Sequence, residues 1–118
     1  MFRDCYASFD KENSRVVIGN SRIEKVIHIN GIFLRTEKIR DLQNNRTWEG
    51  EVSCWQRCPV LEPKEQPELY FDSIPIEKPL GMQPHLKTTL EFVGENGTFW
   101  CEFIVFPDIF FIFFRYFF

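Results

Sequence analysis

The dipeptide Asn30-Gly31 constrains the fold of this chain more than any other feature, because it separates two runs rich in β-branched and apolar residues. These runs are RIEKVIHI at residues 22–29 and IFLRTEKIR at residues 32–40. Asn-Gly accepts the positive φ angles of a type I′ turn, whose twist matches that of two paired strands. The sequence therefore predicts an antiparallel hairpin with Asn30-Gly31 as its turn.

A second hairpin is predicted further along the chain. In LKTTLEFV, residues 86–93, apolar residues or threonine at even positions alternate with mostly polar residues at odd positions, as in a half-buried strand. In TFWCEFIVF, residues 98–106, one face is shared by Phe99, Cys101, Phe103 and Val105. The turn GENG joins the two runs, so we expect a loop of about four residues.

The rest of the chain also favours strands over helices. RVVIGN at residues 15–20 and the segment around residues 48–56 have the composition of short strands. Six prolines interrupt residues 58–84, where only residues 69–76 are expected to form an edge strand. No stretch has helical spacing of apolar residues over more than two turns. We predict an all-β antiparallel sandwich, a partial supersandwich, with little or no helix.

The chain ends in PDIFFIFFRYFF. Its apolar run stops at Arg115 and is far shorter than the roughly 20 residues of a membrane-spanning helix. As a strand it would place phenylalanine on both faces, with nothing after it to cover the edge. We therefore divide the chain into a sandwich portion at residues 1–109 and a Phe-rich tail at residues 110–118, which we interpret as the product of a truncation or frameshift near Pro107.

Composition excludes several classes of partner. The net charge is −3 and the basic residues are scattered, so we expect neither nucleic acid nor an anionic membrane as partner. A small membrane-associated protein that uses the Phe-rich tail is the least favoured alternative. The first ten residues lack the long apolar stretch of a secretory signal, so a cytoplasmic location is expected; the alternative is that the true start of the protein lies elsewhere.

The cysteines and histidines do not predict a metal site. The sequence contains four cysteines, Cys5, Cys54, Cys58 and Cys101. Disulfides are possible with an even number, but reduced and partly buried thiols are favoured because a chain of this length needs no such cross-links. The spacing of Cys54 and Cys58 suits zinc, yet a structural zinc site needs four ligands and a second pair is lacking. We expect neither a metal nor another cofactor.

Acidic pairs offer the nearest approach to a catalytic motif. Glu49 and Glu51 share one strand face, a spacing compatible with the two carboxyl groups of a glycoside hydrolase. A solvated strand face is the favoured interpretation, because no third group is in sight to shift either pKa. The chain contains neither a G-x-S-x-G serine nor a glycine-rich phosphate loop, so no catalytic residue is predicted.

Tryptophan is the residue type that points to a ligand. An aromatic ring offers a flat apolar face to the C–H face of a sugar. Trp48 and Trp100 stand beside turns, where a ligand can reach them, so they are the candidate carbohydrate contacts; Trp55 lacks this placement. The alternative, which is commoner for any single tryptophan, is burial in the sandwich core.

Between residues 17 and 50 the chain resembles the start of the N-terminal β-sandwich of glycoside hydrolase family 36, the α-galactosidase type. The elements that carry the resemblance are Gly19-Asn20, the strand Ile23 to Lys25, the triplet Leu34-Arg35-Thr36, and the turn from Asp41 to Trp48. The later run LEFVGENGTFWCEFIVFPDI is similar to a strand pair of the same domain, so the resemblance covers roughly residues 15–109.

This resemblance implies a function for the chain. In that family a (β/α)₈ barrel follows the sandwich and carries two catalytic aspartates, and the present chain contains neither. It is then a non-catalytic N-terminal fragment of a carbohydrate-active hydrolase that packs on a catalytic barrel absent here. The implied partners are that barrel, a galactoside or oligosaccharide, and a second copy of the chain. The alternative is a stand-alone β-sandwich module for carbohydrate binding or adhesion.

Overall fold

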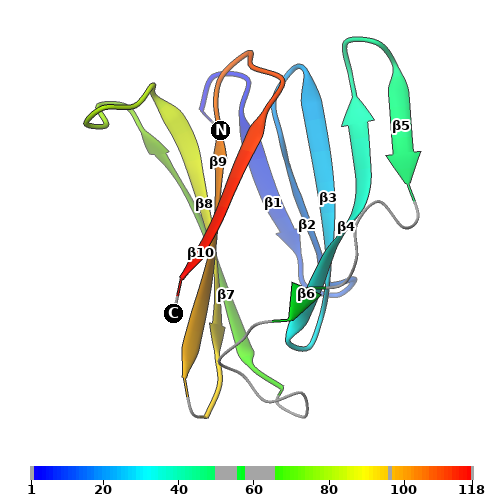
Figure 1. The fold of residues 1–118 in the computed structure, drawn as a ribbon, viewed down its shortest axis with the longest axis vertical. Helices are drawn as coiled ribbons and strands as arrows, with labels where there is room; N and C mark the ends of the chain where they lie inside the picture. The colour runs from blue at the N-terminus through cyan, green and yellow to red at the C-terminus, as the bar shows by residue number, and fades with distance from the viewer. Residues whose placement is uncertain (1, 50–55, 58–65, 96, 118) are drawn as a thin grey trace.

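The computed structural model describes residues 2–49, 56–57, 66–95 and 97–117. These residues form two antiparallel sheets that stand side by side and face each other (Figure 1). No helix occurs among them. The prediction of an all-β antiparallel sandwich is therefore confirmed.

The first sheet is a meander, in which consecutive strands are neighbours. Its strand order is β1-β2-β3-β4-β5, and a two-residue strand, β6, also pairs with β4. The strands are β1 Tyr6–Asp10, β2 Arg15–Gly19, β3 Ile23–Asn30, β4 Phe33–Asp41, β5 Arg46–Glu49 and β6 Gln56–Arg57. Strand β1 was not predicted from the sequence, and the centre of the strand expected around residues 48–56 lies outside the described residues.

The second sheet is also a meander, with the strand order β10-β9-β8-β7. Its strands are β7 Glu68–Ile76, β8 His85–Val93, β9 Thr98–Val105 and β10 Ile112–Phe117. Strand β7 lies at an edge, as predicted from its proline content. Pro75 is tolerated there because an edge strand has one side without ladder hydrogen bonds.

The hairpin of β3 and β4 is confirmed, but its turn lies one residue later than predicted. Asn30 pairs with Phe33, so Gly31 and Ile32 are the two central residues. Gly31 has a φ of 62°, whereas Asn30 and Ile32 do not have positive φ values. A positive φ at the first central position alone is the pattern of a type II′ turn, so the type I′ prediction is wrong. The shift places Ile32, which is 1% exposed, in the core.

The hairpin of β8 and β9 matches the prediction in its register. Val93 pairs with Thr98, so four residues connect the two strands, as expected. The Gly94 N–H donates to the Gly97 carbonyl oxygen at 2.9 Å. All of the residues expected on one face of β9 are buried, namely Phe99, Cys101, Phe103 and Val105.

The hydrophobic core fills the space between the sheets. Alternate residues of β2, β3 and β4 meet alternate residues of β8 and β9. Phe92 contacts Phe99 edge to face with ring centroids 6.0 Å apart, and Phe103 contacts Phe114 at 5.0 Å. Burial of one such ring contributes about 2 kcal/mol, so these ring contacts within the second sheet stabilise its core face.

Strand β10 carries the phenylalanine-rich segment into the second sheet. Phe114 packs against the core, whereas Phe113 is 43% exposed and Phe111, just before the strand, is 53% exposed. Arg115 donates through Nε to the nearly buried Glu102 at 2.7 Å, which ties β10 to β9. The strand therefore places phenylalanine on both faces, as expected, and it forms an edge of its sheet.

Asn20 connects the two sheets at one end of the sandwich. Its side chain is fully buried, and its Oδ1 accepts hydrogen bonds from the backbone N–H groups of Arg22 and Ile23. Its Nδ2 donates to the carbonyl oxygens of Phe106 at 2.7 Å and Ile109 at 2.8 Å, in the loop between β9 and β10. All the hydrogen-bonding groups of the amide thus have partners, and the β2–β3 turn is fixed to the second sheet.

Asp4 and Asp108 add exposed contacts around Asn20. The Asp4 carboxylate accepts from the Ser21 N–H and hydroxyl and from the Asp108 N–H. These hydrogen bonds lower the pKa of Asp4, although desolvation acts in the opposite direction and is the largest single effect. Arg22 binds Asp108 with an Nε–Oδ1 distance of 2.8 Å. The N-terminal segment, the β2–β3 turn and the β9–β10 loop are therefore joined at one end of the molecule.

Replacing Asn20 with alanine is expected to lower the free energy of unfolding by about 2–4 kcal/mol, because buried carbonyl and N–H groups lose their partners. Urea denaturation measures this loss. Asn44→Ala is the matched control, because the Asn44 side chain is exposed and donates to Asp41 within one turn at 2.9 Å. The control should cost less than about 1 kcal/mol. Equal losses for the two variants would contradict the role of Asn20.

The cysteines provide a chemical test of the core. Cys5 and Cys101 are buried thiols, which confirms the prediction for these two cysteines. Cys54 and Cys58 lie outside the described residues. Desolvation raises the pKa of Cys5 to about 11. Because the thiolate is the reactive form, Cys5 should resist iodoacetamide at neutral pH in the native protein and react in urea. Peptide mapping by mass spectrometry measures this, and rapid native labelling of Cys5 would show that the core is open.

Candidate functional site

Three polar or aromatic side chains form a row on the outer face of the second sheet. Tyr70 in β7 pairs with Glu91 in β8, and Glu91 pairs with Trp100 in β9. Their sequence neighbours Leu90 and Phe99 are buried in the core, so the alternation of each strand turns the row outward. We call Tyr70, Glu91 and Trp100 the aromatic row.

Carboxylates fix both rings of the aromatic row. The Trp100 Nε1–H donates to Glu91 Oε2 at 2.7 Å, which orients the indole relative to β8. The Tyr70 hydroxyl donates to Glu68 Oε2 at 2.6 Å, along its own strand. Tyr70 is 52% exposed and Trp100 is partly exposed. The arrangement presents two oriented rings with a carboxylate between them.

The electrostatic environment of the aromatic row is negative. The pKa of Tyr70 is raised, chiefly because its hydroxyl donates to Glu68 and further because of the charge of Glu68. Desolvation and the charge of Glu91 add smaller effects in the same direction. The field opposes formation of a phenolate and would oppose an anionic ligand for the same reason.

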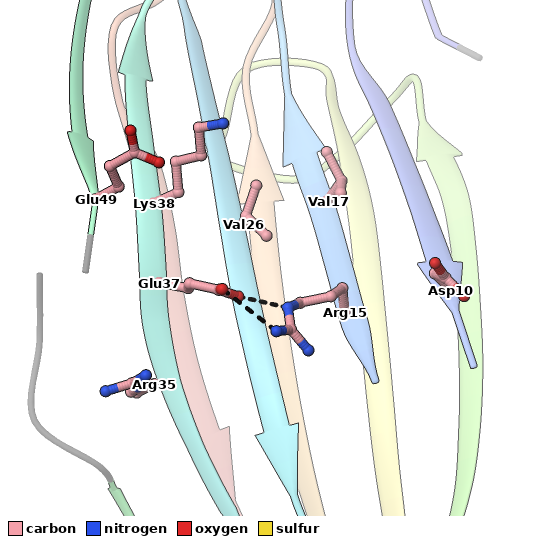
Figure 2. Close-up of a pocket in the computed structure, with 8 residues that line it drawn as sticks. All are labelled: Asp10, Arg15, Val17, Val26, Arg35, Glu37, Lys38 and Glu49. Atoms are coloured by element: carbon pink, nitrogen blue, oxygen red, sulfur yellow. Dashed lines mark hydrogen bonds and ion pairs between the residues drawn. The ribbon is translucent and has the colours of Figure 1, made fainter. Parts of the chain in front are cut away.

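A hollow of about 440 Å³ lies on the outer face of the first sheet (Figure 2). Acidic and basic side chains around two valines form its lining. These residues are Asp10, Arg15, Val17, Val26, Arg35, Glu37, Lys38 and Glu49. Figure 2 shows them on neighbouring strands of the sheet, with Arg15 and Glu37 directed toward each other.

A β-bulge supplies one of the charges in this hollow. Val26 pairs with Lys38 and Ile27 pairs with Thr36, so Glu37 is an extra residue in β4. Glu37 Oε2 lies 2.5 Å from Arg15 Nε, and both side chains are about one third exposed. The hollow contains three acidic and three basic residues, so its formal charge is balanced. We interpret it as a solvated strand face, which agrees with the favoured interpretation of Glu49.

The structure separates the two tryptophans that the sequence singled out. Trp100 belongs to the aromatic row of the second sheet, whereas Trp48 lies in β5, in register with Ile39 at the edge of the first sheet. Trp48 is 45% exposed, so a ligand can reach it, but the two rings do not form one surface. Trp55 and Glu51 lie outside the described residues.

The sequence analysis missed Tyr70 and Glu91. The signal for Glu91 was available, because a four-residue loop that pairs Val93 with Thr98 also pairs Glu91 with Trp100. The sequence offered no such signal for Tyr70, because the register of β7 against β8 depends on the proline-interrupted connection between these strands. Only the three-dimensional structure brings Tyr70 into the row.

In the part of the chain that the structure describes, no group of three histidine, cysteine or acidic residues is placed to hold a metal ion. The same residues include no helix long and apolar enough to cross a bilayer.

Comparisons with known proteins do not assign a family. No protein-family model, no curated protein and no solved structure matches this chain. The resemblance to glycoside hydrolase family 36 therefore stays a prediction. The candidate site rests on its geometry alone.

The hydrogen bond between Tyr70 and Glu68 can be tested by titration. Glu68→Gln removes the charge that raises the pKa of Tyr70, so this pKa should fall toward that of free tyrosine. Tyrosine ring resonances followed by NMR through alkaline pH measure it. Glu24→Gln is the matched control, because Glu24 accepts from the Tyr6 hydroxyl on the other sheet and should leave the Tyr70 pKa unchanged. An unchanged Tyr70 pKa in Glu68→Gln would contradict the contact.

Proposed function

We propose that this chain is a non-catalytic, carbohydrate-binding β-sandwich and that the aromatic row is its contact surface. The observation that carries the proposal is the pair of oriented rings, Tyr70 and Trp100, with Glu91 between them on the outer face of a sheet. Aromatic faces stack on the C–H faces of sugars, and a carboxylate accepts hydrogen bonds from sugar hydroxyls.

Three aspartates with lowered pKa values support a binding role over a catalytic one. A glycoside hydrolase needs a carboxylic acid whose pKa is raised so that it can donate a proton. The pKa values of Asp4, Asp10 and Asp41 are all shifted in the opposite direction, Asp10 and Asp41 chiefly through hydrogen bonds from nearby asparagines. Glu91 is engaged in positioning Trp100.

A second candidate function is the one that the family resemblance implies, in which the sandwich packs on a catalytic barrel. The exposed aromatic edge at β10 favours it. Phe110, Phe111, Phe113 and Tyr116 are each more than 40% exposed, and such a group of apolar side chains is typical of a contact surface. Under this proposal the aromatic row would extend the sugar site of the complete enzyme.

The carbohydrate-binding proposal predicts a specific pattern among ring substitutions. Trp100→Ala and Tyr70→Ala should each weaken binding to a recognised glycan about tenfold or more, because each removes a stacking surface. Glycan-array screening identifies the ligand, with galactosides and other oligosaccharides included, and isothermal titration calorimetry measures the affinity.

Trp48→Ala is the matched control, because Trp48 is an exposed tryptophan on the other sheet. Its affinity should equal that of the original chain. Circular dichroism checks that each variant keeps its fold, and Tyr70→Ala is informative even where Trp100→Ala unfolds, since Tyr70 is 52% exposed. Absence of binding to every glycan on the array, or a loss confined to Trp48→Ala, would refute the proposal.

A further inference from the structure

The direction of the aromatic row limits the shape of its ligand. Tyr70 lies on β7 and Trp100 lies on β9, with β8 between them. The distance between β7 and β9 is therefore twice the spacing of neighbouring strands, about 10 Å. One pyranose ring covers one aromatic face. A ligand that contacts both rings must therefore be an extended chain that crosses the three strands.

Three carboxylates lie beside the rings on this face, two of them next to Tyr70 and one between Tyr70 and Trp100. Glu68 and Asp72 alternate with core-facing residues in β7 and thus flank Tyr70 on the same side of the sheet. Glu91 lies between the rings. Only one of its oxygens accepts from Trp100, and a carboxylate has further acceptor positions for a ligand.

Basic groups on the described part of this face do not offset these carboxylates. Arg115 is engaged with Glu102, with an Nη2–Oε1 distance of 2.5 Å. Lys87 pairs with Ile74 and Ile104, two rows away from the aromatic row. The field at the row is therefore negative, whereas the hollow of the first sheet has balanced charges.

We propose that the ligand is a linear glycan that carries positively charged amino groups, namely an oligomer of deacetylated hexosamine. This proposal rests on the proposed function. Sugar rings stack on Tyr70 and Trp100, while ammonium groups donate charge-assisted hydrogen bonds to the carboxylates of the row and its flanks. A polyanionic glycan meets like charges on the same face and is rejected.

Calorimetry with two oligomers of matched length tests the proposal. One is β-1,4-linked glucosamine and the other is its N-acetylated form, which has the same linkage without the positive charge. The glucosamine oligomer should bind about tenfold more tightly at low salt, and the difference should shrink in high salt. Equal binding, or tighter binding of the acetylated oligomer, would overturn the proposal.

Glu91→Gln tests the location of the effect. The glutamine amide oxygen can still accept from Trp100, while the negative charge is removed. The ratio between the two affinities should fall from about tenfold to about twofold. Glu49→Gln removes one charge from the hollow on the other sheet and is the matched control, so its ratio should stay at the original value. If Glu91→Gln and Glu49→Gln change the affinity ratio equally, the assignment of the charge effect to the aromatic row is refuted.

Two further outcomes separate this inference from the function on which it rests. If neutral glycans bind through Tyr70 and Trp100 and glucosamine oligomers bind no better, the carbohydrate-binding function stands and the amino-glycan inference falls. If no glycan of any charge binds, both fall. A polylysine peptide of matched charge should bind at least tenfold more weakly than the glucosamine oligomer, since it lacks rings to stack. Equal binding by polylysine would also overturn the inference.

Discussion

The buried amide of Asn20 is the contact on which the arrangement of the two sheets depends. Each sheet is a meander and satisfies its own backbone through local hairpins, so hydrogen bonds within the sheets do not orient one sheet against the other. Asn20 supplies this link, because its Oδ1 closes the β2–β3 turn while its Nδ2 binds two carbonyl oxygens of the β9–β10 loop. A buried polar group is costly unless it is hydrogen-bonded, so the four bonds of Asn20 hold the β9–β10 loop against the β2–β3 turn.

Gly19 shows how closely the chain is packed next to this contact. A Cβ at this position would lie 2.4 Å from the Ile23 carbonyl oxygen and 2.8 Å from the Tyr6 hydroxyl. The missing side chain lets the Tyr6 hydroxyl pass over Gly19 and donate to Glu24 at 2.6 Å. The Gly19-Asn20 pair, which the sequence analysis noted only as part of a family resemblance, thus has a physical role in joining strands and sheets.

The two outer faces of the sandwich use charge in different ways. On the first sheet, the bulge at Glu37 brings this carboxylate to Arg15, and the hollow around them is electrically balanced. On the second sheet, Glu91 accepts a hydrogen bond from the indole N–H of Trp100. The indole is uncharged, so this contact does not balance the charge of a carboxylate. This difference is the reason that we propose a ligand for the aromatic row rather than for the hollow.

The sequence by itself determined the strands of the two hairpins and the faces that β8 and β9 bury, whereas β1 was not predicted from it. Alternation in β8 and β9 was sufficient to predict which residues face the core, because the side-chain period of a strand is a local property. The turn at Gly31 was displaced by one residue because burial of Ile32 depends on the opposite sheet, which local turn preferences do not include. The alignment of Tyr70 with Glu91 and the separation of Trp48 from Trp100 were decided only by the tertiary structure, since strand register and sheet order depend on contacts between distant parts of the chain.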